Sequence, residues 1–301
     1  MIYRLAKHLE AFWLRAFPGG NRFPPLFIVG VPRSGTTVVY QHLVNNRRFA
    51  FFSNLAKAYP RSPLMASLWT LAVHRFRRSY ESRFGIIPGA SSPSDGWEIF
   101  HRWFPERDLS QETAWDKLPE LPAIVRGLER LYRAPFINKN NSNSIRIPAL
   151  SSIFPDSLYV HVRREMLANV SSLLRARQAH GIPLGSWWGA LPPRFWRHPF
   201  HDEIEQAVFQ VCDVAHEIET TLAQLPSRRW LALDYESFCT DPGGILVWVD
   251  GAMRRQGVKL KARRGGGAAA IHLSEGGPGD GPFRRRVEES VARWRSLVTH
   301  G

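Results

Sequence analysis

The chain is 301 residues long, with 44% hydrophobic and 22% charged residues, a composition that excludes a fully disordered protein and fits one compact domain. Forty Lys and Arg residues against 26 Asp and Glu residues give a formal charge of +14. Such a surface attracts anions, including nucleic acid, acidic lipid, sulfated glycan and phosphorylated nucleotides, but a generally basic surface without a specific ligand explains the charge equally well. Charge alone therefore identifies no ligand.

Two cysteines, Cys212 and Cys239, are present, without CxxC spacing and without a neighbouring histidine pair. This pattern indicates neither a disulfide framework nor a zinc site. We therefore expect a cytoplasmic protein that uses no metal.

Residues 1–23 are predicted to form an amphipathic helix, because apolar side chains recur there at helical spacing. Lys7, His8 and Glu10 interrupt the unbroken apolar run that a signal peptide or a membrane span requires. We interpret the segment as a helix that packs on the domain, while peripheral contact with a membrane surface stays open. Residues 24–301 are predicted to form a single domain.

The rest of the chain alternates predicted strands with predicted helices. The apolar run Leu26–Val29 is typical of a strand buried on both faces, and a helix is expected to begin after Gly35. Further strands are expected at Phe136–Ile137, Ser157–Val162 and Trp230–Asp234, and further helices at residues 165–180, at residues 203–225 and from Glu236. This order predicts an α/β fold in three layers, with a mainly parallel β-sheet flanked by helices and ligands at the carboxyl ends of its strands.

Two segments are predicted as loops from their composition. Residues 85–95 are rich in Gly, Pro and Ser. Residues 259–281 combine Lys and Arg with runs of glycine, and we expect them to be mobile.

The loop after the first strand carries the clearest chemical signal. Residues Gly30–Thr37 read G-V-P-R-S-G-T-T, which has the glycine spacing of the phosphate loop G-x-x-x-x-G-K-[ST] but threonine in place of its lysine. Between a strand and a helix, such a loop directs backbone N–H groups and the positive end of the helix dipole at one point, where a phosphate fits. The loss of the lysine, at Thr36, argues against an ATP or GTP hydrolase, which neutralises the β- and γ-phosphates with that side chain.

The motif P-R-S-G-T-T after an apolar strand resembles the 5′-phosphosulfate loop of sulfotransferases that use 3′-phosphoadenosine 5′-phosphosulfate (PAPS). A second segment, residues 160–174, resembles the part of the family that holds the 3′-phosphate with an arginine at a strand end and a serine eight residues later. Arg163 and Ser171 have that spacing. Where the family often has Asp-Pro after the arginine, Arg164-Glu165 stand here. The resemblance spans about residues 24–250 and implies the P-loop NTPase-like sulfotransferase fold.

The resemblance implies a role for each of these residues. Arg33 takes the position of the catalytic basic residue that contacts the 5′-phosphosulfate, and Lys139 could add positive charge at the bridging oxygen, although it could equally be an ordinary strand-end lysine. The residues implied in binding PAPS are Arg33, Ser34, Gly35, Thr36, Thr37, Arg163 and Ser171. No metal is implied.

The general base is harder to assign. Some family members have a histidine shortly after a lysine in a K-T-H-like segment, but residues 139–143 contain none. Asp95 is our candidate base and Glu98 the reserve, because the segment around them resembles one where bacterial members place an acidic residue. A solvated loop carboxylate is an equally good interpretation of either one.

Several other residues have open interpretations. Trp187, Trp188 and Trp196 could line an acceptor pocket, but tryptophans at such spacing more often fill the core. His161 lies inside a predicted strand and is expected to be packed. The stretch Arg263-Arg264-Gly265 weakly resembles a basic loop of the family near the 3′-phosphate, and a disordered basic loop is the better interpretation.

The predicted function is transfer of a sulfuryl group from PAPS to a hydroxyl or amine of an acceptor. The alternatives are a P-loop kinase that uses ATP and magnesium, and a non-catalytic module that binds polyanions. The acceptor is expected to carry a free hydroxyl on a glycan, a lipid, a peptide tyrosine or a small molecule, and no specific nucleic-acid partner is expected.

Overall fold

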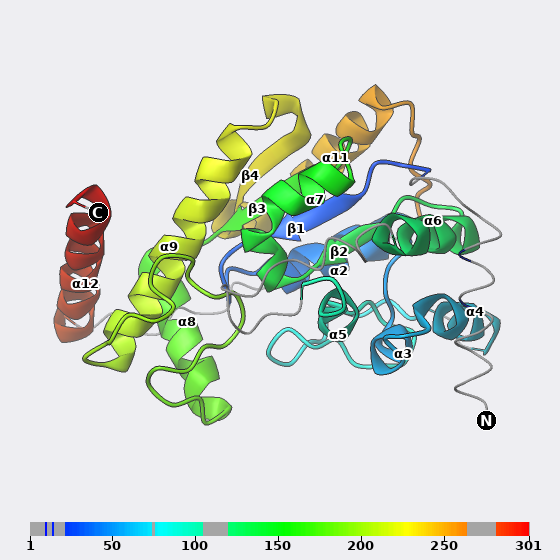
Figure 1. Cartoon of the computed structure of the whole chain (residues 1–301). Helices are drawn as coiled ribbons and strands as arrows, with labels where there is room; N and C mark the ends of the chain where they lie inside the picture. The colour runs from blue at the N-terminus through cyan, green and yellow to red at the C-terminus, as the bar shows by residue number, and fades with distance from the viewer. Residues whose placement is uncertain are drawn as a thin grey trace.

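A four-stranded parallel sheet forms the centre of the protein in a computed structural model, with strand order β2-β1-β3-β4 (Figure 1). The structure describes residues 10, 14, 22–73, 76–104, 120–263 and 281–300. The four strands are β1 (Leu26–Val29), β2 (Ile137–Lys139), β3 (Leu158–Arg163) and β4 (Trp230–Asp234). Helices flank the sheet, as the predicted three-layer α/β class requires.

The helices lie between and after these strands. The first half of the described chain contains α2 (Thr36–Asn46), α3 (Asn54–Ala58), α4 (Pro63–Val73), α5 (Trp97–Phe100) and α6 (Glu120–Tyr132). The second half contains η1 (Asn141–Ile145), α7 (Ile147–Ile153), α8 (Met166–Ala179), α9 (Glu203–Ala223), η2 (Ser227–Arg229), α10 (Tyr235–Thr240), α11 (Gly243–Arg255) and α12 (Gly281–His300), where η marks a 3-10 helix. The strands and helices predicted at residues 26–29, 136–139, 157–180, 203–225 and 230–238 are confirmed.

Strand β1 is central because its side chains are apolar on both faces. All four of its residues are at most 1% exposed, and the strand pairs with β2 on one side and β3 on the other. The ring of Phe27 packs among aromatic rings of neighbouring elements, with centroids 5.9 Å from Phe154 and 5.7 Å from Tyr159. Burial of this kind stabilises by roughly 25 cal/mol per Å² of apolar surface, so β1 anchors the loop that follows it.

The predicted N-terminal helix at residues 1–23 lies mostly outside the described residues. At Glu10 the segment packs on the domain, because the buried carboxylate accepts hydrogen bonds from the N–H groups of Leu64 (3.0 Å) and Met65 (3.1 Å) at the start of α4. Leu14 packs against the core. No helix among the described residues combines the length and apolar character needed to cross a membrane.

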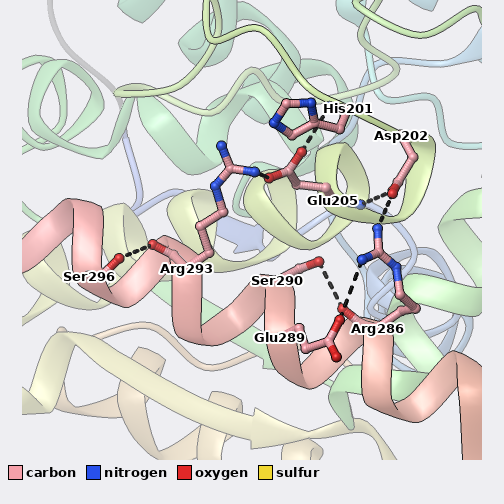
Figure 2. Close-up of polar contacts among 8 residues, drawn as sticks. All are labelled: His201, Asp202, Glu205, Arg286, Glu289, Ser290, Arg293 and Ser296. Atoms are coloured by element: carbon pink, nitrogen blue, oxygen red, sulfur yellow. Dashed lines mark hydrogen bonds and ion pairs between the residues drawn. The ribbon is translucent and has the colours of Figure 1, made fainter.

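The C-terminal helix α12 packs along α9, away from the sheet (Figure 1). Figure 2 shows its polar contacts: Arg286 pairs with Asp202, the N-cap of α9, and Arg293 pairs with the buried carboxylate of Glu205. Val287, 1% exposed, adds an apolar contact between the two helices. The arginines matter here because a buried carboxylate without a partner would be costly.

The first part of the segment predicted to be mobile from Lys259 is instead held to the body of the protein. The carbonyl of Lys261 accepts a hydrogen bond from the N–H of Arg48 (2.9 Å), and Arg263 donates its N–H to the carbonyl of Asn46 (3.0 Å). Residues 264–280 lie outside the described residues.

A buried carboxylate joins α6 to the segments that lead into β1 and β2. Glu129 accepts hydrogen bonds from the N–H groups of Arg22 (2.7 Å), Phe23 (3.2 Å) and Phe136 (3.4 Å). Burial raises the pKa of Glu129 to about 7, against the lowering effect of these hydrogen bonds and of Arg126. The protonated form is therefore favoured in the folded protein over a pH range in which the unfolded chain is ionised.

This raised pKa predicts the direction of a pH effect on stability. The folded state binds a proton more tightly than the unfolded state, so the free energy of unfolding should fall as pH rises from about 4.5 to about 7. Glu129→Gln cannot ionise and should reduce this fall by up to roughly 3 kcal/mol. Urea unfolding of both proteins at pH 5 and pH 8 measures the effect, and equal pH dependence in the two proteins would show the assignment to be wrong.

Candidate active site

The carboxyl ends of the parallel strands meet around the loop that follows β1. This loop, Gly30–Gly35, and the residues just after β2, β3 and β4 line a cavity of about 200 Å³, which we call the loop cavity. Its polar lining comes from Arg33, Thr36, Thr37, Ser82, Lys139, Asn141 and Arg164, and its aromatic lining from Phe84, Trp188 and Tyr235. The position at the carboxyl edge of the sheet is the one predicted for ligands of this fold class.

The loop turns sharply, and two of its positions accept only glycine. Gly35 has φ +95°, and a Cβ there would lie 2.2 Å from the ring of Tyr235. At Gly30 a Cβ would lie 2.7 Å from the carbonyl oxygen of Val162 on the adjacent strand. Arg33, with φ 71°, adopts the left-handed conformation that glycine usually fills. Strained backbone of this kind is retained where function requires a particular loop shape.

Side chains from three elements hold the loop in this shape. Ser144 of η1 bonds both the N–H and the carbonyl of Gly30 through its hydroxyl, each at 3.0 Å. Asn169 of α8, with its amide in the orientation that satisfies both atoms, donates to the carbonyl of Pro32 (3.3 Å) and accepts from the N–H of Ser34 (3.2 Å). Arg164 donates to the carbonyl of Arg33 at 3.1 Å. The loop is therefore positioned before any ligand binds.

The loop has the properties of an anion site. Helix α2 starts at Thr36 with no acidic residue in its first turn and no side-chain cap, and within the described part of the chain the N–H groups of Gly35, Thr36 and Thr37 have no acceptor. The hydroxyl of Ser34 is buried without a hydrogen-bond partner among the described residues. Orphan donors at a helix N-terminus, together with the helix dipole, favour a phosphate-type group.

Among the described residues that line the loop cavity, three are cations and none is acidic. Burial is the main cause that lowers the pKa of Arg33, followed by Arg164 and Arg175. Lys139 is 6% exposed, and its side-chain ammonium makes no hydrogen bond or ion pair with any described residue. Burial lowers the pKa of Lys139 against the opposing effect of Asp95. Buried positive charge without a carboxylate partner fits a site that receives an anionic ligand.

The structure separates Arg163 and Ser171 from the loop cavity. The guanidinium of Arg163 pairs with Asp234 at the end of β4, 3.0 Å away. Ser171 lines a different surface cavity of about 880 Å³, next to α9 and the start of α12. The two side chains therefore do not meet at the loop.

The residues one position later do face the loop. Arg164 lines the loop cavity and packs its guanidinium over the ring of Tyr235, 5.1 Å from the centroid. Ser172 accepts a hydrogen bond from Nε of Arg33 at 3.2 Å. Neighbouring residues on a strand or helix point in different directions. A shift of the family pattern by one residue therefore changes which arginine and which serine face the loop.

A signal in the sequence could have found this register. The family pattern places an acidic residue after the arginine, and Glu165 takes that place if the arginine is Arg164. Its carboxylate caps α8, accepting from the N–H groups of Leu167 (3.0 Å) and Ala168 (2.7 Å). The acidic residue is thus a helix cap, and it aligns the family pattern with Arg164 in place of Arg163.

Asp95 and Glu98, the predicted candidates for the base, lie beside the loop cavity and do not line it. Both pair with Lys57, at 3.3 Å and 3.6 Å. Asp95 also accepts from the N–H of Trp97 at 3.3 Å, and its carbonyl accepts from the amide of Asn138 on β2 at 3.0 Å. The carboxylate of Asp95 is close enough to influence the pKa of Lys139.

A histidine that sequence reasoning did not single out adjoins the cavity. The ring of His180 stacks on Trp188 (centroids 5.6 Å apart) and meets Phe84 edge-on (4.7 Å), and both of these aromatic residues line the cavity. Gln210 fixes this wall by donating to the carbonyls of Trp188 (3.0 Å) and Ala190 (2.7 Å).

The remaining predicted residues lie elsewhere. Trp187 donates its indole N–H to the carbonyl of Trp196 at 3.0 Å, and neither side chain lines the loop cavity. His161 is packed as predicted, and burial, followed by Arg163, lowers its pKa to about 4. Arg263 lies over the ring of Phe76, 4.4 Å from the centroid, apart from the loop.

A parallel sheet with a phosphate-type loop after β1 defines a P-loop-like α/β protein. The model of the sulfotransferase family matches residues 24–247. The chain therefore belongs to the sulfotransferase family.

Solved structures agree with this assignment. Sulfotransferase STF9 from Mycobacterium avium is similar at a TM-score of 0.56 and 15% identity, over 96% of this chain and 73% of that one. Sulfotransferase STF1 from Mycobacterium tuberculosis H37Rv is similar at a TM-score of 0.52 and 14% identity, over 97% of this chain and 81% of that one. At these identities the likeness shows a shared fold. No curated protein sequence matches this chain.

The glycine requirement of the loop can be tested with a matched pair of variants. Gly35→Ala and Gly181→Ala both place a side chain at positive φ, which costs about 1 kcal/mol, but only the first meets the ring of Tyr235. We expect Gly35→Ala to cost about 3 kcal/mol in total and to lower the melting temperature clearly more than Gly181→Ala. Thermal unfolding measures both variants, and equal losses would contradict the packing described for the loop.

Proposed function

We propose that this protein transfers a sulfuryl group from PAPS to a hydroxyl or amine of an acceptor. The observation that carries the proposal is the loop cavity, where three cations and the N–H groups at the start of α2 converge and no described lining residue is acidic. Membership of the sulfotransferase family supports this reaction class. The absence of the P-loop lysine at Thr36 disfavours the alternative, a kinase that uses ATP and magnesium.

The loop residues would hold the 5′-side of the donor. Ser34 offers a buried hydroxyl without a partner among the described residues, and Gly35, Thr36 and Thr37 offer N–H groups. These donors suit a phosphate at the positive end of the α2 dipole.

For the 3′-phosphate we propose Arg164 and Ser172 in place of Arg163 and Ser171. The spacing of eight residues is the same, but Arg164 and Ser172 are the pair that contacts Arg33. A terminal phosphate carries about two negative charges and suits an arginine together with a hydroxyl donor.

PAPS, when bound, supplies the sulfuryl group and a phosphate leaving group. Arg33 and Lys139 face the cavity with positive charge and would stabilise the negative charge that develops on the leaving oxygen in an in-line displacement. Lys139 is well suited because the site around it is largely closed to water, which strengthens electrostatic interactions. The backbone of Gly85 passes close to the side chain of Lys139 and covers this part of the cavity.

The acceptor hydroxyl needs a base in line with the leaving group. Asp95 remains our candidate, because its charge acts on Lys139 inside the cavity. His180 is the second candidate, since its ring contacts both Phe84 and Trp188 at the aromatic wall.

The aromatic wall also bears on the acceptor. Phe84 and Trp188 offer ring faces beside the cationic part of the cavity, a surface on which a sugar ring or a phenol packs well. We propose an acceptor with a free hydroxyl on a glycan, a lipid headgroup or a small molecule.

The proposal is tested by calorimetric titration with 3′-phosphoadenosine 5′-phosphate (PAP) and with ATP plus magnesium. We expect PAP to bind and ATP plus magnesium to bind far more weakly, because the loop lacks the lysine for the β- and γ-phosphates. The reverse preference would support a kinase. Failure of both nucleotides, with retained binding of heparin, would support the polyanion-binding module.

The proposed register of the 3′-phosphate site predicts a contrast between neighbouring residues. Arg164→Ala should weaken PAP binding by about 1.5–3 kcal/mol and Ser172→Ala by about 1 kcal/mol, because each loses a hydrogen bond to a charged group. Arg163→Ala and Ser171→Ala serve as matched controls and should stay close to wild type. Isothermal titration of all four variants tests the assignment, and larger losses in the Arg163 and Ser171 variants would restore the original register.

The two candidate bases predict different kinetic outcomes. Asp95→Asn should lower the turnover of labelled PAPS by at least about 100-fold while PAP affinity is unchanged, because general base catalysis contributes about 10²–10⁴-fold. His180→Asn should leave turnover within a few-fold if Asp95 is the base. Normal turnover in Asp95→Asn together with a large loss in His180→Asn would transfer the role to His180.

A further inference from the structure

A second cavity gathers positive charge at the opposite edge of the sheet. It has a volume of about 480 Å³, and six of its ten lining residues are cationic: Arg22, Arg48, Arg130, Arg133, Lys259 and Lys261. None of the lining residues that the structure describes is acidic. We call it the basic cavity.

The basic cavity is separate from the loop cavity. Phe23, in its lining, comes before β1, and Ala134 and Pro135 come before β2, whereas the loop cavity lies after the same strands. The two cavities share no lining residue. The basic cavity therefore has no part in the site proposed for PAPS.

The segments that carry the six cations are fixed by backbone hydrogen bonds. Arg48 donates its N–H to the carbonyl of Lys261 at 2.9 Å, and Arg22 donates its N–H to the buried carboxylate of Glu129 at 2.7 Å. The carbonyl of Pro135 accepts from the N–H of Ala50 at 2.8 Å. The fold thus places cationic residues from distant parts of the sequence around one cavity.

One backbone feature of the basic cavity is unusual for a surface turn. Arg133, which follows α6, has φ 51°, a conformation that non-glycine residues rarely adopt. Glycine or asparagine would be less strained at this position. An arginine there is consistent with a functional role of its side chain.

Two described carboxylates near the basic cavity, Glu129 and Asp250, have other partners. Glu129 is committed to three backbone N–H groups, and burial raises its pKa to about 7. Asp250 pairs with Arg47 at 2.6 Å. Six cations in a concave space with low-dielectric walls focus a positive potential that draws in anions.

We propose that the basic cavity binds a compact polyanion that carries two or more phosphate or sulfate groups. Its volume falls in the range of about 300–1,000 Å³ that is typical of small-molecule sites. A nucleic acid, in contrast, is bound along an extended basic groove. Phe23 and Val258 add apolar contact for the scaffold between the anionic groups. Phosphate and sulfate groups both accept hydrogen bonds from the guanidinium group of arginine and the ammonium group of lysine.

The proposal is tested with inositol hexakisphosphate as the probe, titrated into protein saturated with PAP so that the loop cavity is occupied. The cavity variant is Arg133→Gln/Lys259→Gln/Lys261→Gln. The control variant Arg254→Gln/Arg284→Gln/Arg285→Gln removes the same charge from exposed positions that do not line the cavity. Unchanged affinity for PAP in both variants verifies their folding.

We expect one binding event that the cavity variant weakens at least about tenfold and the control variant by no more than about twofold. Equal weakening in the two variants would mean attraction by net charge alone and would overturn the proposal. Loss of the event when PAP is present would place the probe in the loop cavity and would also overturn it. If PAP does not bind, the proposed function fails, but the same titration without PAP still compares the two variants. The test of the basic cavity is therefore independent of the test of the proposed function.

Sedimentation with vesicles that contain phosphatidylinositol 4,5-bisphosphate, compared with neutral phosphatidylcholine vesicles, identifies the source of the anionic groups. Co-sedimentation that depends on the three cavity residues supports the site and assigns it to lipid headgroups. Probe binding without co-sedimentation supports the site and assigns it to soluble polyanions.

Discussion

The strained turn at Gly30–Gly35 is the constraint on which the rest of the site depends. It can form only because Gly35 leaves room for the ring of Tyr235 and Gly30 leaves room for the adjacent strand. The turn directs the first N–H groups of α2 and the side chain of Arg33 into one small cavity. Buried β1 provides the rigid base, and α8 and η1 supply the hydrogen bonds that hold the turn.

Arg164 connects this turn to the rest of the proposed donor site. It bonds the carbonyl of Arg33 and packs on Tyr235, the same ring that requires glycine at position 35. Its side chain therefore positions the turn and lines the cavity at once. Cationic side chains also gather in two separate cavities, because the basic cavity lies before the strands and the loop cavity after them. A net charge of +14 thus reflects more than a uniformly basic surface.

Local patterns predicted the fold well, because a buried strand such as Leu26–Val29 and a glycine loop are visible in a few neighbouring residues. The same local patterns did not predict which side chains of β3 and α8 face the loop cavity. The spacing of eight fits Arg163 and Ser171 as well as Arg164 and Ser172, and the acidic residue Glu165 after Arg164, together with the packing of β3 and α8, distinguishes the pairs. The ion pair of Asp95 with Lys57, and the basic cavity, unite residues distant in the sequence, so no short motif contains them.

A nucleotide phosphorylated at both ends is the ligand that we propose for the loop cavity. The most direct test compares PAP with adenosine 5′-phosphate, which lacks the 3′-phosphate, by calorimetry at one ionic strength. PAP should bind at least about tenfold more tightly, and Arg164→Ala should remove most of this difference. Equal affinity of the wild-type protein for the two nucleotides would show that the site does not recognise the 3′-phosphate.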